Sequence, residues 1–145
     1  MVKEKSKKQK GRQKTTKRIG SLGYPVGDFL IRVKNAALAY NKEIEVDKTK
    51  YIEAVAKVLK EEGFVDKVKV SGEKLKVRLA YQKKEPVMLG LKLISKPGLR
   101  IYSDVKAIEN RKGPSVLIIS TPRGVVSTRR ALKLRVGGEV IAKIW

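Results

Sequence analysis

The chain has 145 residues and a net charge of +21, from 35 basic and 14 acidic side chains. Charge this far from neutrality favours a polyanionic partner, with nucleic acid preferred over an anionic membrane. The sequence contains neither Cys nor His, which excludes disulfides, thiol nucleophiles, imidazole bases and nearly every zinc site.

Residues 1–23 are polar and basic and show no hydrophobic period. Such a segment is predicted to be disordered without a partner, and it fits equally a solvated tail or an arm that folds along RNA. It lacks the apolar stretch of a secretory signal, and no apolar run in the chain approaches the ~20 residues that span a bilayer. We expect a cytoplasmic protein without membrane contact; an organelle transit peptide is the alternative for this basic segment.

Residues 24–85 are predicted to form an α+β unit. Apolar residues at helical spacing follow Pro25, and a short alternating strand occupies 42–46. Asp47 or Thr49 can cap a second helix, which Gly63 ends. Alternation over 64–70 and 75–81 then predicts a β-hairpin, in which Val65, Val68 and Val70 face Leu75, Val77 and Leu79.

Residues 86–145 are predicted to form a second unit that is mostly β. An alternating strand from Val87 to Leu93 leads to a turn at Pro97-Gly98, with one helical turn at 104–108. Near this turn the chain places two cations and an aromatic ring, Lys96, Arg100 and Tyr102. Basic residues beside an aromatic ring suit RNA, because the ring can stack on a base and the cations can contact phosphates.

The stretch 115–131 carries the strongest pattern. A short apolar strand, 116–119, leads into a tight loop, Ser120-Thr121-Pro122-Arg123-Gly124, and a second short strand follows. Ser127 or Thr128 is predicted to cap a helix that opens at Arg129-Arg130. Hydroxyls, free N–H groups and arginines in one place suit phosphate and sugar oxygens.

The chain ends with a predicted turn at 136–139 and a strand over 140–145. Glu139 in that turn can accept hydrogen bonds from a guanine edge or from a neighbouring arginine. Residues 86–145 carry twelve basic and three acidic side chains, whereas residues 21–85 carry fourteen and ten. The excess of positive charge therefore indicates a binding surface in the C-terminal half.

Two other classes of function were weighed. An RNA-processing or phosphate-processing enzyme needs a base that titrates near neutral pH or a carboxylate cluster for metal, and no such group is visible. A DNA-binding protein or free mRNA repressor would need a base-reading element, and no recognition helix is apparent. We therefore expect no catalytic residue, no metal and no cofactor.

Five segments resemble, in the same order, motifs of the bacterial-type small-subunit ribosomal protein S8 family. They are residues 25–36, 58–64, 95–102, 120–126 together with Ala131, and 136–140. The resemblance runs from about residue 24 to residue 145. It implies two small α+β domains packed together, with an N-terminal α-β-α-β-β domain at 24–85 and a mostly β C-terminal domain with a short helix at 86–145, after the basic tail 1–23.

The same resemblance implies a structural protein that binds the central domain of small-subunit rRNA, aids subunit assembly and touches neighbouring ribosomal proteins. In some bacteria the family also represses translation of its own operon by binding the mRNA. The residues expected at RNA lie mainly in the C-terminal domain, with a lesser contact on the first helix: Ser120, Thr121, Pro122, Arg123, Gly124, Ser127, Arg129, Arg130, Glu139, Tyr102, Lys96, Arg100, Arg32 and Asn35.

Overall fold

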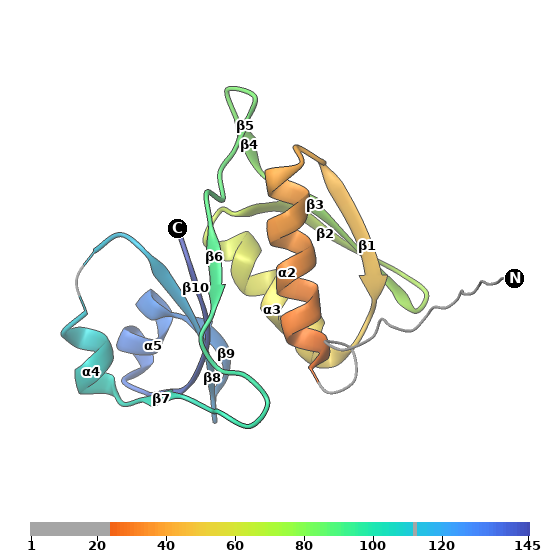
Figure 1. Ribbon diagram of the computed structural model, residues 1–145. Coiled ribbons are helices and arrows are strands. Elements are labelled where there is room, and N and C mark those ends of the chain that lie inside the picture. Colours follow the sequence, from red (N-terminus) through yellow and green to blue (C-terminus); the bar gives the residue numbers. More distant parts are fainter. Residues whose placement is uncertain (1–23, 112) are drawn as a thin grey trace, which may run out of the picture.

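The computed structural model describes residues 24–111 and 113–145, so the expectations for the basic tail 1–23 fall outside the described residues (Figure 1). In chain order the elements are α2 (Pro25–Leu38), β1 (Glu43–Asp47), α3 (Lys50–Glu61), β2 (Val65–Ser71), β3 (Lys74–Leu79), β4 (Tyr81–Gln82), β5 (Glu85–Pro86), β6 (Leu91–Leu93), β7 (Tyr102–Ser103), α4 (Val105–Glu109), β8 (Val116–Thr121), β9 (Gly124–Ser127), α5 (Thr128–Leu134) and β10 (Gly138–Ile144). The mixture of helices and strands confirms the predicted α+β class.

The two long helices form where the apolar spacing predicts them. Pro25 lies in the first turn of α2, where its missing N–H costs no helical hydrogen bond. Thr49, rather than Asp47, caps α3: its hydroxyl accepts a hydrogen bond from the Ile52 N–H at 3.1 Å. Beyond α3 the chain turns at Gly63 with φ +87°, a conformation that glycine adopts without strain.

The N-terminal sheet has the strand order β1-β3-β2, and all its pairs are antiparallel. The predicted facing pairs of the hairpin are confirmed, since Val65, Val68 and Val70 lie opposite Leu79, Val77 and Leu75 respectively. The sequence did not indicate the small hairpin formed by β4 and β5. Its turn residues, Lys83 and Lys84, both have positive φ, and it projects from the molecule at the top of Figure 1.

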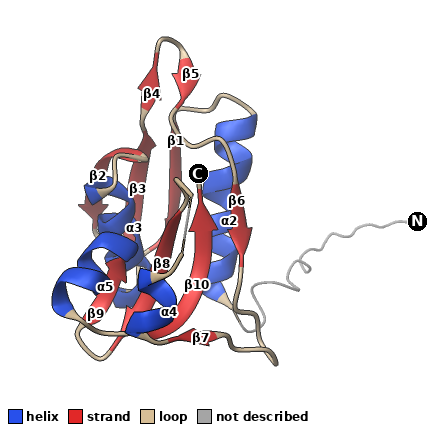
Figure 2. Ribbon diagram, turned by 90° about the vertical axis from the view of Figure 1, so that its left-hand side faces the viewer, coloured by secondary structure: helices blue, strands red, loops and turns tan. Residues whose placement is uncertain are grey.

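The C-terminal sheet has the order β6-β10-β8-β9, with β7 paired to the first residues of β10. Figure 2 shows α4 and α5 on one side of this sheet and α2 on the other. A smaller apolar cluster lies on the α4–α5 side: Ile108, Leu117, Ile119, Val126, Ala131 and Val140. The neighbouring Ile118 points the other way, into the larger cluster. Both faces of β8 are therefore buried, which explains its continuous apolar run.

The larger cluster draws on both halves of the chain. Phe29, Leu30 and Leu59 from the long helices belong to it, and so do Leu91, Ile118, Ile141 and Ile144 from the C-terminal sheet. A register shift between Val140 and Ala142 in the β8–β10 pairing adds one residue to β10. With this bulge, Val140 packs on the α4–α5 side while Ile141 and Ala142 belong to the larger cluster.

The strand expected over 87–93 is shorter in the structure, where only Leu91–Leu93 form β6. The backbone N–H groups of Leu89 and Gly90 instead both donate to the carbonyl oxygen of Trp145, at 2.8 and 3.1 Å. A Cβ atom on Gly90 would lie 2.4 Å from the Trp145 ring, so glycine is required for this contact. In the described part of the chain, no helix is long and apolar enough to cross a membrane.

Candidate nucleic-acid interface

Several predicted site residues meet at one end of the molecule. In Figure 1 the loop between β6 and β7, the turn between β8 and β9 and the N-terminal end of α2 all lie at this end. Here β10 begins between β7 and β8, so that Glu139 lies opposite Tyr102 on one side and Ser120 on the other. Residues opposite one another in register share a face of the sheet, so these three side chains form one row.

The start of β10 differs from the sequence-based expectation. The turn predicted over 136–139 ends earlier, and Gly138 and Glu139 already belong to the strand. A Cβ atom on Gly138 would lie 2.1 Å from the carbonyl oxygen of Ser120, so glycine allows the two backbones to approach closely. Glu139 is therefore fixed by strand pairing rather than exposed at a flexible turn.

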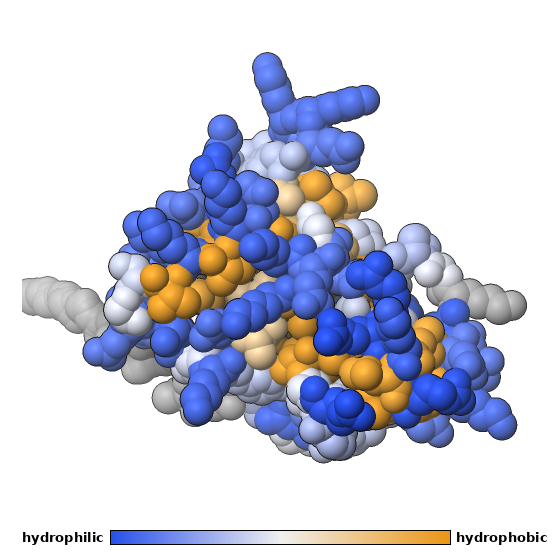
Figure 3. Space-filling view, turned by 180° about the vertical axis from the view of Figure 1, so that it is seen from behind, coloured by the Kyte–Doolittle hydropathy of each residue, from blue (hydrophilic) through white to orange (hydrophobic). Residues whose placement is uncertain are grey.

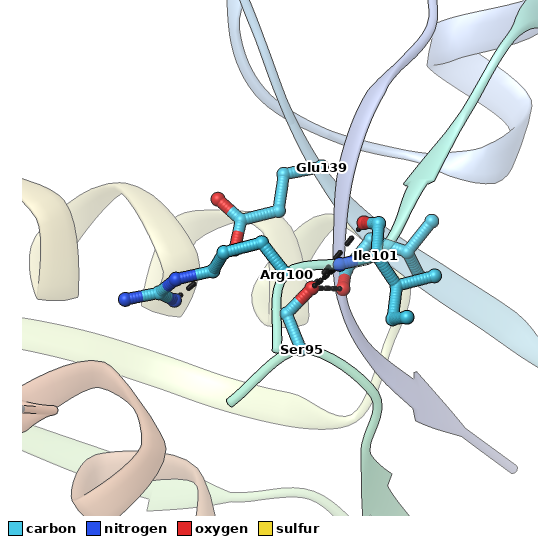
Figure 4. A network of polar contacts seen from close by, with 5 residues as sticks. Ser95, Arg100, Ile101 and Glu139 are labelled. Atoms are coloured by element: carbon cyan, nitrogen blue, oxygen red, sulfur yellow. Dashed lines mark hydrogen bonds and ion pairs between the residues drawn. The ribbon is translucent and has the colours of Figure 1, made fainter. Parts of the chain in front are cut away.

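Ser95 ties the base of the β6–β7 loop to β10, and it is fully buried (Figure 4). Its hydroxyl accepts a hydrogen bond from the Ile101 N–H at 2.9 Å and donates to the Val140 carbonyl oxygen at 2.7 Å. The two ends of the loop, at Ser95 and Ile101, are therefore held together and fixed to β10 by this one hydroxyl. Sequence analysis placed Ser95 in a motif but gave it no role, because nothing local indicates that this hydroxyl is buried.

Arg100, on the same loop, is held by contacts that reach both halves of the chain. Its guanidinium lies 3.1 Å from the Glu139 carboxylate (Figure 4) and 5.0 Å from the centre of the Tyr24 ring. The ring position suits a cation–π interaction. The side chain of Glu139 is only 19% exposed, so this ion pair is partly shielded from water. The sequence suggested a guanine edge or a neighbouring arginine as the partner of Glu139, and in the structure the partner is Arg100.

Two tyrosines from the N-terminal half border this row, although sequence analysis did not select them. Burial raises the pKa of Tyr24, and the nearby Arg100 cation partly offsets that rise. Burial also raises the pKa of Tyr51, where the Ser120 hydroxyl acts in the opposite direction. Both tyrosine hydroxyls therefore stay neutral at physiological pH. Glu139 in the row and Arg100 beside it form the charged pair at this place.

The turn between β8 and β9 is held by its own atoms. The Thr121 hydroxyl donates to the Gly124 carbonyl oxygen at 2.7 Å and accepts from the Arg123 N–H at 3.0 Å. Gly124 has φ +109°, which strongly favours glycine. Pro122, Arg123 and Gly124 are exposed, and among the described residues no carboxylate pairs with Arg123. The turn therefore presents a guanidinium on a defined backbone.

The helix after β9 begins one residue earlier than expected, at Thr128, and Ser127 is its cap. The Ser127 hydroxyl accepts from the Arg130 N–H at 3.4 Å and is buried, so its observed role is structural. Arg129 lies 3.2 Å from Glu62, and Arg130 lies 4.0 Å from Glu61. These pairs join α5 to the end of α3 across a groove lined by Glu61, Ser127, Arg129, Arg130, Lys133 and Leu134.

The remaining predicted residues lie at different places. Lys96 is exposed and pairs with Leu99 across the turn of the β6–β7 loop, and Tyr102 is 69% exposed beside it. Arg32 and Asn35 are not part of the end surface formed by the β6–β7 loop, the start of β10 and the β8–β9 turn. Arg32 instead donates to the Glu45 carbonyl oxygen at 3.0 Å, which places it beside β1. Seen from behind, the most hydrophilic residues gather around a hydrophobic patch on the C-terminal half (Figure 3).

Comparison with known proteins decides the family. The sequence model of the family described as Ribosomal protein S8 matches residues 24–145. The chain is 40% identical over 124 residues to the small ribosomal subunit protein uS8 of Nitratidesulfovibrio vulgaris (strain Miyazaki F), which covers 83% of this chain and 97% of that protein.

The chain belongs to the ribosomal protein S8 family.

Other S8 proteins support the assignment. Identity to the uS8 protein of Mycoplasmopsis synoviae is 40% over 129 residues, covering 83% of this chain and 96% of that protein. Identity to the uS8 protein of Vesicomyosocius okutanii is 38% over 130 residues, covering 86% and 99%. The S8 family is a structural component of the ribosome and not an enzyme, so the protein has a ribosomal structural role. Among the described residues no group of acidic side chains is arranged to hold a metal ion.

Proposed function

We propose that this protein binds the central domain of small-subunit rRNA directly, through the end surface formed by the β6–β7 loop, the start of β10 and the β8–β9 turn. The observation that carries the proposal is the row of Tyr102, Glu139 and Ser120 on three adjacent strands, with Arg100 fixed beside it. The exposed ring and the hydroxyl can contact bases, the Glu139 carboxylate holds Arg100 beside them, and Arg123 on the adjoining turn can contact phosphate.

The geometry supports two kinds of role for the predicted residues. Tyr102, Lys96, Arg123 and Gly124 are exposed and would contact RNA directly. Thr121 and Ser127 use their hydroxyls within the fold, so they would act by shaping the turn and the helix that carry the contacts. Arg129 and Arg130 lie at a groove beside this surface and would contact phosphates at its border, whereas Arg32 and Asn35 would make a separate, lesser contact.

The proposal also covers the assembly role and the partners. A protein that binds rRNA by itself can join the subunit early and anchor its central domain before neighbouring ribosomal proteins arrive. An operon mRNA that reproduces the shape of the rRNA site would fit the same surface, so repression of the operon is a second consequence of one binding site. A cytoplasmic ribosome is part of the proposal, and the similarity to bacterial uS8 proteins is consistent with it.

The test is binding of the purified chain to its own central-domain rRNA fragment and to a scrambled RNA across a salt series. The chain should prefer the cognate fragment at high salt, since shape and base contacts survive ion screening better than phosphate contacts. Ser120→Ala with Thr121→Val should weaken cognate binding at least tenfold more than scrambled binding. Equal weakening of both would contradict a specific role for this turn.

A further inference from the structure

The solvent face of the N-terminal sheet carries a regular pattern of charge that only the strand register reveals. In the first row, Glu43 of β1 lies opposite Arg78 of β3, which lies opposite Lys67 of β2. The second row has the same order of signs, with Glu45, Lys76 and Lys69. Each row therefore reads acidic, basic, basic from β1 to β2.

The third row shows how such a row is balanced. Asp47 lies opposite Lys74, and the Lys74 ammonium donates a hydrogen bond to the Asp47 carboxylate at 2.5 Å. That hydrogen bond lowers the pKa of Asp47. The residue opposite Lys74 on β2 is Ser71, which is neutral. The first two rows differ because each has a second cation where the third row has a serine.

The extra cations create two like-charge pairs on adjacent strands. Lys67 lies directly opposite Arg78, and Lys69 lies directly opposite Lys76. All four side chains are exposed, and we call them the basic square. Like charges directly opposite one another destabilise a sheet. Glu43 and Glu45 lie opposite only the β3 members of these pairs, Arg78 and Lys76. A local arrangement that costs stability is expected where function requires it.

The acidic residues of β1 do not neutralise the outer part of the basic square. They lie beside β3, whereas Lys67 and Lys69 lie two strands away, at about 9–10 Å, where salt screens most of the attraction. Arg78, one of the four residues of the square, forms a long ion pair of 4.0 Å with Asp66, which lies outside the square. Among the described residues no carboxylate pairs with Lys67, Lys69 or Lys76.

We propose that the basic square is a second docking surface, and that it takes the phosphate backbone of RNA without reading its sequence. Four flexible cations on a flat sheet face match closely spaced phosphates, which need only point charges. The square contains no aromatic or apolar anchor, and lysine is depleted from the cores of protein–protein interfaces, so an RNA backbone fits it better than a protein does. The inference rests on the proposed binding of small-subunit rRNA.

The square is separate from the end surface in both position and mode of recognition. It lies on the strands of the N-terminal sheet, whereas Tyr102, Glu139 and Ser120 lie on the C-terminal sheet. The end surface would set the preference for the cognate RNA, while the square would add affinity for any RNA segment long enough to reach it. The two surfaces therefore give different signals in one binding experiment.

The test compares Lys67→Gln/Lys69→Gln with a control that loses the same charge, Lys83→Gln/Lys84→Gln, at the exposed turn between β4 and β5. Each full-length variant is titrated with the central-domain rRNA fragment and with scrambled RNA from low to high salt. For both RNAs the square variant should make the negative slope of log affinity against log salt shallower by about 1–2, because up to two phosphate contacts are lost. Its Tm without RNA should rise by about 1–3 °C, because like-charge repulsion is relieved.

Weaker RNA binding together with higher stability would support the proposal, because damage to the fold would lower both. The proposal would be overturned if the salt slope of the square variant equalled that of the control. Aggregation of the variant with an unchanged salt slope would overturn it as well, because the lysines would then serve only to protect the edge strand from pairing. Failure of the proposed function looks different. In that case the unaltered chain shows no preference between the two RNAs, whatever the square variant does.

Discussion

The two loops of the proposed RNA-binding surface reach a defined shape by different routes. The β8–β9 turn is closed by its own residues, since the Thr121 hydroxyl bonds to Gly124 and to the Arg123 N–H, and Gly124 supplies the positive φ. The β6–β7 loop depends on residues far away in sequence: Ser95 bonds to Val140, and Arg100 contacts Glu139 and Tyr24. The shape of the β8–β9 turn therefore follows from its local sequence, whereas the shape of the β6–β7 loop depends on contacts with distant segments.

The two loops should therefore respond differently to substitutions. Substitutions inside the β8–β9 turn should change that turn and leave the rest of the molecule intact. Substitutions at the anchors of the β6–β7 loop should reach β10, and through Arg100 the start of α2 as well. Three variants test this contrast, in decreasing order of expected effect on the free energy of unfolding.

Ser95→Ala should have the largest effect, because it removes a buried hydroxyl that both donates and accepts. The Val140 carbonyl and the Ile101 N–H each lose a partner, and we expect a loss of about 2–3 kcal/mol in the free energy of unfolding. Urea denaturation measures this free energy. The control Ser71→Ala, at the exposed end of β2, should change the free energy of unfolding by less than about 0.5 kcal/mol. Similar losses in the two variants would show that Ser95 is no anchor.

Gly124→Ala should have an intermediate effect, confined to the turn. A side chain at φ +109° strains the backbone by about 1–2 kcal/mol, although there is space for its Cβ atom. The preference for cognate over scrambled RNA should fall, while amide hydrogen exchange around Ser95 and Ile101 stays unchanged. Gly113→Ala is the matched control, because Gly113 has φ +105° and space for a Cβ atom but lies outside both loops; it should leave the RNA preference unchanged. Faster exchange at Ile101 in the glycine variant would refute the independence of the two loops.

Glu139→Gln should have the smallest effect on stability, under about 1 kcal/mol, because its partner Arg100 is 41% exposed. The arginine is nevertheless released from its fixed position, so the ratio of cognate to scrambled affinity should fall about three- to tenfold. Glu109→Gln removes the same charge from an exposed pair with Arg135, 3.6 Å away, and should leave that ratio unchanged. An equal fall in both variants would indicate a general effect of charge.

Much of the N-terminal half could be predicted from the sequence, because its elements follow from local spacing. The helical stripe after Pro25, Thr49 as one of the two candidate capping residues, and the facing pairs of the hairpin all appear where the pattern indicates them. The turn around Pro122 and Gly124 was likewise visible, because a proline and a glycine between two apolar runs leave few alternatives. It is shorter than predicted, since β8 runs through Ser120 and Thr121 and β9 begins at Gly124. These features depend on neighbours within about four residues or directly across one hairpin.

Other features follow from contacts between segments that are distant in the chain. The burial of Ser95, the insertion of β10 between β7 and β8, and the bulge near Ile141 arise only when the C-terminal sheet assembles. The pairs Lys67–Arg78 and Lys69–Lys76 follow from the predicted hairpin register. The position of Glu43 and Glu45 beside β3 rather than β2 depends on the strand order, which the sequence did not show. The sequence determined most of the helices, strands and turns, together with the excess of positive charge. The tertiary structure decided which distant segments lie side by side, since only packing brings β1 beside β3 and β10 between β7 and β8.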